Sequence, residues 1–424
     1  MDIKKIKNEF IIYSQKLLKN TKNFLKWITI AVIVGIVVGS FSTLFAYSLT
    51  KVTDFREKNE WIICFLPLAG CVIVYLYKIF HYENNKGTNL VLSTIHSETE
   101  LAFRMAPLIF ISTIITHMFG GSAGREGAAL QLGGSIGSKL SRLMKLDEQD
   151  QHVVIMCGMS AAFSALFGTP MAAAIFSMEV VSVGVMYYAA LVPCVFASLI
   201  ASKFAFTMGI SPESFKITEI PELSVENVVK IIIIALLCAA ISVLFCMLLH
   251  GTGDLYRAYL KNPYIRIIFS GCIIILLSAV LKTNDYLGAG IPIIEKAIKG
   301  KVVPFAFVLK MIFTALTLEA GFKGGEIVPS FCVGATLGCF IGQVLGISPS
   351  LCAAVGMIGV FCGVTNCPVT SLLISFELFG YKGVSYFMIV IAVSYLMSGY
   401  YGLYSDQTIV YSKYKAKYVN KKTK

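Results

Sequence analysis

Apolar segments follow one another along almost the whole chain, separated by short breaks that contain Gly, Pro or a few charged residues. Their approximate ranges are 27–50, 61–80, 103–119, 153–165, 171–182, 188–208, 228–249, 264–281, 303–317, 331–346, 352–363, 369–379 and 384–398. Inside a bilayer every backbone polar group needs a partner within the protein, so such segments predict α-helices. Only 14% of the residues are charged and the mean hydropathy is +0.76, whereas soluble domains carry about 25% charged residues. We therefore expect an all-α polytopic membrane protein.

Several of these segments are too short to cross a membrane. A helix needs about 20 residues to span the ~30 Å hydrocarbon core, and segments such as 153–165, 171–182 and 352–363 fall short. Short segments interrupted by Gly or Pro are typical of broken helices around a buried site. Many helices are consequently expected to be tilted, broken or re-entrant.

Two motifs of the first half of the chain recur in the second half. GREGAALQLGGSIG (124–137) matches GEIVPSFCVGATLG (325–338) at three glycines. GMSAAFSALFGTPMAAAIFSMEV (158–180) matches GMIGVFCGVTNCPVTSLLISFEL (356–378) at six positions, one of them Pro and one Glu. The repeat predicts two homologous halves, and transporters built in this way bind their substrate near the midplane between the halves.

The boundaries follow from the apolar segments and the charged ends. We expect the first repeat half at 27–215, a polar linker at 216–226 and the second half at 227–412. Residues 1–26 contain seven Lys and residues 413–424 contain six. Lys-rich flanks of membrane segments usually face the cytoplasm. The protein is thus expected to lie in the cell membrane, embedded in the lipid bilayer as a multi-pass protein with both termini cytoplasmic.

The net charge of +12 does not indicate a nucleic-acid partner. The lysines concentrate at the two ends, and no basic face with interleaved aromatic residues lies outside the apolar segments. The chain contains no HExxH motif, and its five His are dispersed. We expect no metal site, no cofactor and no enzymatic activity.

The stretch GGSAGREGAALQLGGS (120–135) places the charged pair Arg125–Glu126 among apolar segments. An ionisable residue at membrane depth is costly and usually functional. A Gly-rich turn that opens a helix presents free backbone N–H groups and the positive end of the helix dipole, and this arrangement binds anions. The repeat supplies a second such turn in FKGGEI (322–327). Two helix starts would form an anion site without a full positive charge, from which an anion can still be released.

Glu126 can play either of two roles in such a site. As a carboxylate it can occupy the place of the anion, and once protonated it can leave, so that one side chain serves as gate and proton carrier. Alternatively it caps its own helix and pairs with Arg125, because acidic residues favour the first turn. For Arg125 we favour a structural role, in which its five donors brace an irregular loop by binding backbone carbonyls.

These motifs together resemble the CLC family of anion channels and anion/proton antiporters. The resemblance rests on GREG, GGSIG, the segment Gly–Met–Ser–Ala–Ala–Phe with Pro170, the second-half stretch GGEIVPSFCVGATLG, and GYYGLYSDQ (399–407), in the family's order over nearly the whole chain. It implies the CLC-like inverted repeat of two homologous halves, and a homodimer with one pathway per subunit.

Several residues differ from those of the chloride-type members, and all of these differences point to the same subclass. GTNLV (87–91) replaces the usual GSGIP, Ala128 replaces a Pro, and Val180 stands where antiporting chloride members carry an inner proton glutamate. Glu326 replaces an apolar residue. This combination is similar to the fluoride-exporting subclass, although Val328 stands where that subclass commonly has Thr.

The resemblance implies a role for each matching residue. Glu126 is expected to be the gating, proton-carrying glutamate. Side-chain groups of Thr88 and Tyr404 would flank the anion, with Asn89 beside Thr88. The backbone N–H groups of Glu326 and Ile327 would donate to it. The residues expected to shape the two loops are Gly124, Arg125, Gly127, Gly324, Gly325 and Pro329.

Two of these assignments have alternatives. The Glu326 side chain either assists proton movement or anion binding, or caps its own helix near Lys323. The inner tyrosine could also be one of the neighbouring Tyr400 and Tyr401, since Tyr is common at membrane boundaries. Glu179 and Glu377, at equivalent repeat positions, are predicted to be structural and to pair with backbone groups or Lys.

We therefore expect a transporter that exports fluoride in exchange for protons. The alternative is a chloride/proton exchanger or a passive chloride channel of the same family. Fluoride is small and strongly hydrated, so a dry site must offer good hydrogen-bond donors. The same donors could also bind chloride.

Overall fold

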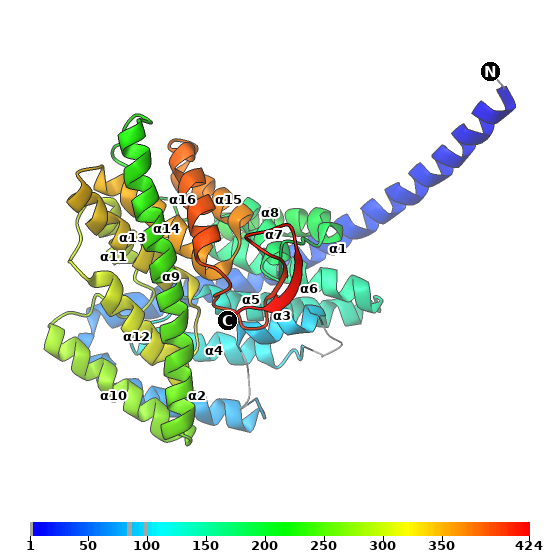
Figure 1. The fold of residues 1–424 in the computed structure, drawn as a ribbon. Coiled ribbons are helices and arrows are strands. Elements are labelled where there is room, and N and C mark those ends of the chain that lie inside the picture. The colour runs from blue at the N-terminus through cyan, green and yellow to red at the C-terminus, as the bar shows by residue number, and fades with distance from the viewer. Residues whose placement is uncertain (1–2, 83–86, 97–100) are drawn as a thin grey trace.

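The computed structural model describes residues 3–82, 87–96 and 101–424, and these are mostly helical (Figure 1). The first half contains α1 (Ile3–Lys58), η1 (Glu60–Phe65), α2 (Leu66–Ile79), α3 (Thr88–His96), α4 (Met105–Met118), α5 (Glu126–Leu143), α6 (Glu148–Phe167), α7 (Pro170–Glu179), β1 (Ser182–Val183), η2 (Tyr188–Ala190) and α8 (Leu191–Thr207). The second half contains α9 (Val225–Tyr259), α10 (Pro263–Leu281), α11 (Ile291–Ile298), α12 (Ala306–Ala320), α13 (Ile327–Leu345), α14 (Pro349–Thr365), α15 (Pro368–Phe379), α16 (Val384–Met397), β2 (Thr408–Tyr411) and β3 (Tyr418–Lys422). Figure 1 shows one packed body, from which the N-terminal part of α1 projects.

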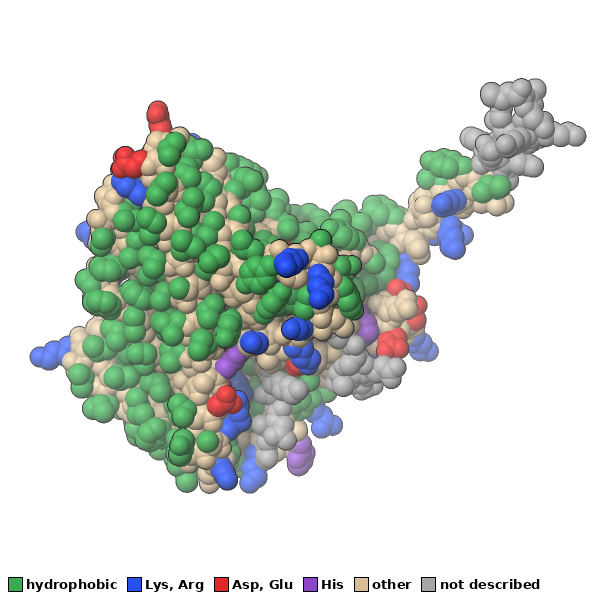
Figure 2. Space-filling view, in the orientation of Figure 1, with side chains coloured by type: hydrophobic (Ala, Val, Ile, Leu, Met, Phe, Trp, Pro, Cys, Tyr) green, Lys and Arg blue, Asp and Glu red, His purple; other side chains and the backbone are tan. Residues whose placement is uncertain are grey.

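Helices of very different length make up this body. Within the described residues, seven are long and apolar enough to cross a membrane: α1, η1 with α2, α6, η2 with α8, α9, α10 and α13. The apolar helices α4, α14, α15 and α16 are shorter, at 10–17 residues. Hydrophobic side chains cover much of the visible surface, as a lipid-facing protein requires (Figure 2). The expected mixture of long helices with short, broken ones is confirmed.

The two halves repeat the same helix crossing. A Cβ added at Gly133 of α5 would lie 2.1 Å from the carbonyl oxygen of Gly158 in α6. In the second half, a Cβ at Gly334 of α13 would lie 2.3 Å from the carbonyl oxygen of Gly356 in α14. Only glycine permits this approach, because no side-chain atom fits between the two backbones. The identities found in the sequence therefore mark the places where the helix backbones touch.

Each half also caps a helix of the other. The Glu179 carboxylate, at the end of α7, accepts hydrogen bonds from Val369 N (3.0 Å) and Thr370 N (2.8 Å) at the start of α15. The Glu377 carboxylate, near the end of α15, accepts from Met171 N (2.8 Å) and Ala172 N (2.9 Å) at the start of α7. Both carboxylates satisfy amides that a helix start leaves without partners. The predicted structural role of the two glutamates is confirmed.

A small sheet near the C-terminus adds to the helical architecture. Its order is β1–β2–β3, with β1 and β2 parallel and β2 and β3 antiparallel. β3 lies within 413–424, which we expected only as a basic tail. Thr, Ile, Val and Tyr at 408–411 and 418–419 favour strands, but the pairing of β2 with β1 depends on contacts far apart in sequence.

Candidate functional site

The two Gly-rich loops meet inside the protein, as the repeat predicts. Gly124 N donates to Gly325 O at 2.7 Å, and Gly325 N donates to Gly124 O at 2.9 Å. Gly324 lies so close to the first loop that a Cβ there would be 2.4 Å from the Cβ of Ala123. Helices α5 and α13 begin directly after this contact, at Glu126 and Ile327. Their N-termini, with their free amides, are therefore held at one place.

The carboxylate of Glu126 lies between these two helix starts. Its side chain is fully buried. Oε1 accepts a hydrogen bond from Val328 N of α13 at 2.9 Å, and Oε2 accepts from Arg125 N at 2.7 Å. The carboxylate is thus an anion bound by backbone amides from both halves, in the field of two helix dipoles. If it moved away, the same amides would be free to bind another small anion.

Arg125 does not pair with the Glu126 carboxylate through its guanidinium. Its Nη2 donates to Glu213 Oε1 at 2.5 Å, and the guanidinium lies over the ring of Phe167, 5.4 Å from the centroid. Glu213 belongs to the irregular segment between α8 and α9. Arg125 therefore braces a loop, as expected, but through a carboxylate where backbone carbonyls were predicted.

Thr88 and Asn89 begin α3 next to the first loop. The Thr88 hydroxyl donates to Gly127 O at 3.5 Å, and a Cβ at Gly127 would lie 2.9 Å from it. Asn89 Oδ1 accepts from the backbone N of Asp406 at 3.1 Å. These two residues therefore link the GREG loop to the segment that carries the candidate inner tyrosines.

Tyr404 is the tyrosine of this segment whose side chain is fully buried. Its side chain is 1% exposed, and its hydroxyl has no hydrogen-bond partner among the described residues. The Tyr400 hydroxyl instead bonds to Ser412 Oγ at 2.9 Å, and Tyr401 is half-buried.

Glu326 precedes α13 and faces the same site. Its Oε2 is buried without a hydrogen-bond partner among the described residues, and its side chain makes no capping hydrogen bond to α13. The geometry does not support the alternative in which Glu326 caps its own helix, and a buried acceptor is left for a ligand or a proton.

The amides at the start of α13 were expected to donate from Glu326 and Ile327. Val328 N, which was not among the expected donors, makes the 2.9 Å hydrogen bond to Glu126 Oε1. The backbone N–H group that donates from the start of α13 is therefore one residue further along the chain than the predicted donors.

Several residues that support the loops were missed in the sequence. His117 Nε2 donates to Gly124 O at 3.1 Å. The fully buried Lys310 donates to Gly288 O (2.7 Å), Ser122 Oγ (3.0 Å) and Tyr286 O (3.1 Å). Lys310 could have been found, because an ionisable residue inside the apolar segment 303–317 is itself a signal. Glu213 could not, because polar residues are ordinary in an irregular segment between two helices.

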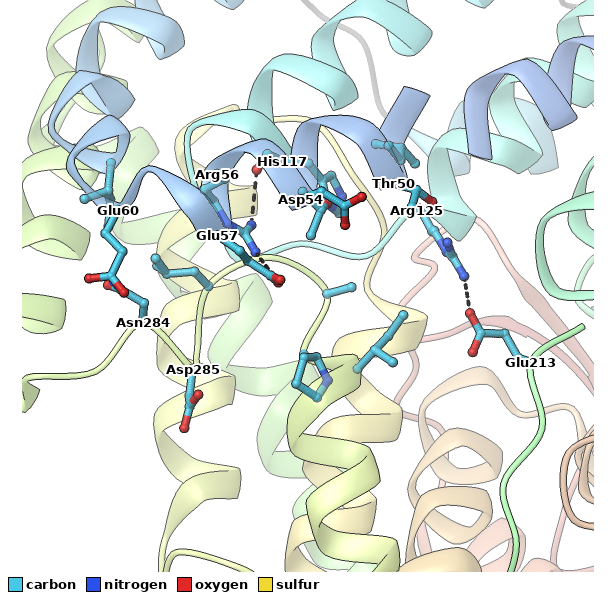
Figure 3. A pocket seen from close by; sticks show the side chains of 18 residues that line it. Thr50, Asp54, Arg56, Glu57, Glu60, His117, Arg125, Glu213, Asn284 and Asp285 are labelled. Carbon is cyan, nitrogen blue, oxygen red and sulfur yellow. Dashed lines mark hydrogen bonds and ion pairs between the residues drawn. The ribbon is translucent and has the colours of Figure 1, made fainter. Parts of the chain in front are cut away.

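A pocket of about 580 Å³ opens beside the end of α1 and reaches Arg125, Glu213 and His117 (Figure 3). Positively and negatively charged side chains line this pocket. Arg56 Nη1 donates to His117 O at 3.1 Å. The carboxylates of the wall belong to Asp54, Glu57, Glu60 and Asp285. The pocket gives solvent a way to the loop that holds Glu126. Together, the geometry describes a buried carboxylate that is held by amides from both halves, next to a pocket that reaches Arg125.

Comparisons with known proteins agree with this geometry. The family model for voltage gated chloride channels matches residues 69–399. A chloride/fluoride channel protein of Pseudomonas syringae is 33% identical over 396 residues, covering 92% of this chain and 88% of the relative. The H+/Cl− exchange transporter ClcA of Vibrio cholerae is 26% identical over 385 residues, covering 82% of this chain and 81% of the relative.

Solved structures give the same result at the level of the fold. A CLC-type fluoride/proton antiporter superposes with a TM-score of 0.87 at 31% identity, covering 90% of this chain and 98% of that one. A slow cyanobacterial Cl−/H+ antiporter gives a TM-score of 0.77 at 17% identity, covering 88% and 94%, and this likeness concerns the fold alone.

Proposed function

The chain belongs to the voltage-gated chloride channel (CLC) family, and on that premise we propose that it is an antiporter that exports fluoride in exchange for protons. The observation that carries this proposal is the position of the Glu126 carboxylate between the amides of Val328 and Arg125. A side chain that occupies an anion site and can also bind a proton couples the two ions by competition.

The exchange cycle follows from the charge of Glu126. While ionised, the carboxylate accepts hydrogen bonds from the amides and blocks the pathway. A proton that arrives through the pocket at Arg125 neutralises it, so that the charge-assisted hydrogen bonds are lost and the side chain swings out. A fluoride ion then replaces the carboxylate as the acceptor of the amide hydrogen bonds. When Glu126 loses its proton toward the opposite side, it displaces the anion and the pathway closes again.

Fluoride selectivity is supported by the residues around this position. A dry site replaces the water around fluoride only if it offers enough hydrogen-bond donors. The Tyr404 hydroxyl has no partner among the described residues, and the Thr88 hydroxyl has a weak one at 3.5 Å. A protonated Glu326 would be a further donor, while its ionised form would accept the exchanged proton. The similarity to a fluoride/proton antiporter over most of the chain favours fluoride as well.

The alternative remains a chloride/proton exchanger or a passive chloride channel, because relatives that carry the name of H+/Cl− exchangers also match. Liposomes that contain the purified protein separate these functions when fluoride, chloride and proton fluxes are recorded in parallel. We expect fluoride efflux to drive proton uptake and to exceed chloride efflux. Fluoride efflux that moves no protons would exclude antiport, and equal chloride efflux would exclude selectivity.

We also propose that the protein works as a homodimer with one pathway per subunit, and that both termini lie in the cytoplasm. The Lys-rich segments 1–26 and 413–424 support this orientation. Chemical cross-linking in the membrane tests the dimer, which should appear as a single species of twice the monomer mass.

A further inference from the structure

The chain that follows Tyr404 turns back on itself and returns to it. β2 and β3 form an antiparallel hairpin in which Thr408 pairs with Lys422 and Ile409 with Lys421. β2 also pairs in parallel with β1, which follows α7. Figure 1 shows the hairpin in red at the C-terminal end of the chain.

The end of the hairpin is buried against the backbone of Tyr404. Thr423 is 7% exposed, although the residues on either side of it are exposed. Its hydroxyl donates to Tyr404 O at 2.5 Å, and its amide donates to Gln407 O at 3.1 Å. Gln407 N donates to the same Tyr404 carbonyl at 3.0 Å. The carbonyl of the inner tyrosine therefore has two donors, one of them from the far end of the hairpin.

Further contacts fix the hairpin at β3 and at its turn. Lys422 forms an ion pair with Asp406 at 2.5 Å. In the turn between β2 and β3, Lys413 Nζ donates to Tyr395 O at 3.0 Å and Ser398 Oγ at 3.2 Å, at the end of α16. The hairpin is thus attached to the helix before Tyr404 and to the turn directly after it.

The Tyr404 side chain has no such anchor of its own. Its hydroxyl makes no hydrogen bond to any described residue. The direction of the ring consequently depends on packing and on the backbone at residue 404. The Tyr404 hydroxyl lies at the far end of the ring, several ångströms from the backbone. A small movement of the backbone at residue 404 therefore displaces the hydroxyl.

We propose that Tyr404 closes one end of the anion site and that Thr423 is its positioning residue: the Thr423 hydroxyl holds the Tyr404 backbone, so that the tyrosine stays closed while Glu126 exchanges its proton. This inference rests on the proposed exchange function, because a gate has meaning only if an anion passes. Without the Thr423 hydroxyl, Tyr404 opens more often and the anion crosses without a proton.

The test compares Thr423→Val with Thr423→Ser in liposomes, by recording fluoride and proton fluxes together. Val keeps the shape and removes the donor, and we expect the uncoupled share of fluoride flux to rise about fivefold, the effect of one ordinary hydrogen bond on an equilibrium. Ser keeps the donor and should restore the wild-type proton-to-fluoride ratio. Thr207→Val is the matched control, because the Thr207 hydroxyl also donates to a backbone carbonyl (Phe204 O, 2.7 Å) at an exposed helix end.

Lys422→Gln provides a second variant, in which the substituted residue is exposed. Lys422 is 68% exposed, so the change leaves the core intact, and we expect a smaller rise in uncoupled flux. Wild-type coupling in both Thr423→Val and Lys422→Gln would overturn the inference, as would a Thr423→Ser variant as uncoupled as Thr423→Val. These outcomes are distinct from failure of the proposed function, in which the wild-type protein itself moves no fluoride against protons.

Discussion

A single buried carboxylate decides what the amides of two helices bind. Because Glu126 accepts from Val328 N and Arg125 N, replacing it by Gln turns an acceptor oxygen into an NH₂ group that faces a donor. Glu126→Gln also cannot carry a proton. We expect fluoride-driven proton flux to fall about a hundredfold or more, the scale that a positioned proton-transfer group contributes.

The control for this substitution is Glu226→Gln, which removes a carboxylate at the exposed start of α9, where Glu226 pairs with Lys230. Proton flux and its pH dependence should be unchanged there, since an exposed pair one helical turn apart contributes little. If Glu126→Gln behaved in the same way, Glu126 would be only a helix cap.

Arg125 acts through Glu213, so these two residues should be coupled in stability. The guanidinium is 13% exposed and the carboxylate 26%, which leaves the pair partly screened by the adjoining pocket. Arg125→Met should lower the stability by about 1–2 kcal/mol. Glu213→Gln should add little when Arg125→Met is already present, as a double-mutant cycle of thermal unfolding would record.

Arg257→Met is the matched control, because its pair with Asp254 is 65% and 77% exposed. We expect almost no change in its melting temperature. Additive losses from Arg125→Met and Glu213→Gln would mean that the two residues act independently of each other.

The residues of the site were predictable to different degrees. Charge at membrane depth, Gly spacing and the family resemblance led to Glu126, Thr88 and Tyr404. The hydrogen bond from Val328 N was not predicted, because the sequence indicates a helix start while loop dihedral angles decide which N–H group points inward. The partner of Arg125 lies 88 residues away in an irregular segment, where no periodicity guides a prediction.

Among the helices, close backbone contact is the feature that the repeat preserves. Gly133→Ala would place a Cβ 2.1 Å from Gly158 O and force α5 away from α6. Overpacking of this kind costs about 1–3 kcal/mol or more, so the purified protein should melt at a lower temperature. Gly251→Ala is the control, because Gly251 lies inside α9 with open space around it, and Ala favours a helix over Gly. A Gly133→Ala protein as stable as the wild type would contradict the close backbone contact between α5 and α6.

The C-terminal hairpin is the element that the sequence did not reveal. Helices follow from apolar segments and their breaks, but a strand of four or five residues gives a weak local signal. Its pairing with β1 joins Val183 to Ile409, a contact between the two halves. Such a long-range contact depends on how the halves pack and cannot be read from local composition.

The hairpin carries a half-buried lysine, Lys413, that should make stability depend on pH. Burial lowers the pKa of Lys413 from 10.5 to about 8. Between those two values the unfolded chain binds more protons than the folded one, so this group makes stability rise as the pH increases through that window. Lys413→Met should remove that part of the rise in melting temperature, while Lys417→Met, at an exposed site of the same hairpin, should not. A rise of equal size in both variants would contradict the burial argument.

Across the whole molecule, the helix lengths have to agree with the proposed position of the ends. Seven helices of the described residues are long enough to cross, and an odd number of crossings would put the ends on opposite sides. Two cytoplasmic ends therefore require that shorter helices such as α4, α14, α15 and α16 combine into further crossings. This is how broken helices reach a midplane site and still connect both sides of the membrane.

Cysteine labelling in intact cells tests this arrangement directly. From Trp27 to Lys58, α1 is roughly 48 Å long at 1.5 Å per residue, so it crosses once and brings Glu57, in the wall of the pocket, to the side opposite the N-terminus. In a background with Cys64→Ser, we expect Glu57→Cys to react with an impermeant maleimide in intact cells. Lys16→Cys in the projecting part of α1 and Lys417→Cys in the hairpin should react only after permeabilisation, because Lys-rich flanks face the cytoplasm. Labelling of Lys16→Cys but not Lys417→Cys in intact cells would mean an odd number of crossings, and the pocket beside Arg125 would then open toward the cytoplasm.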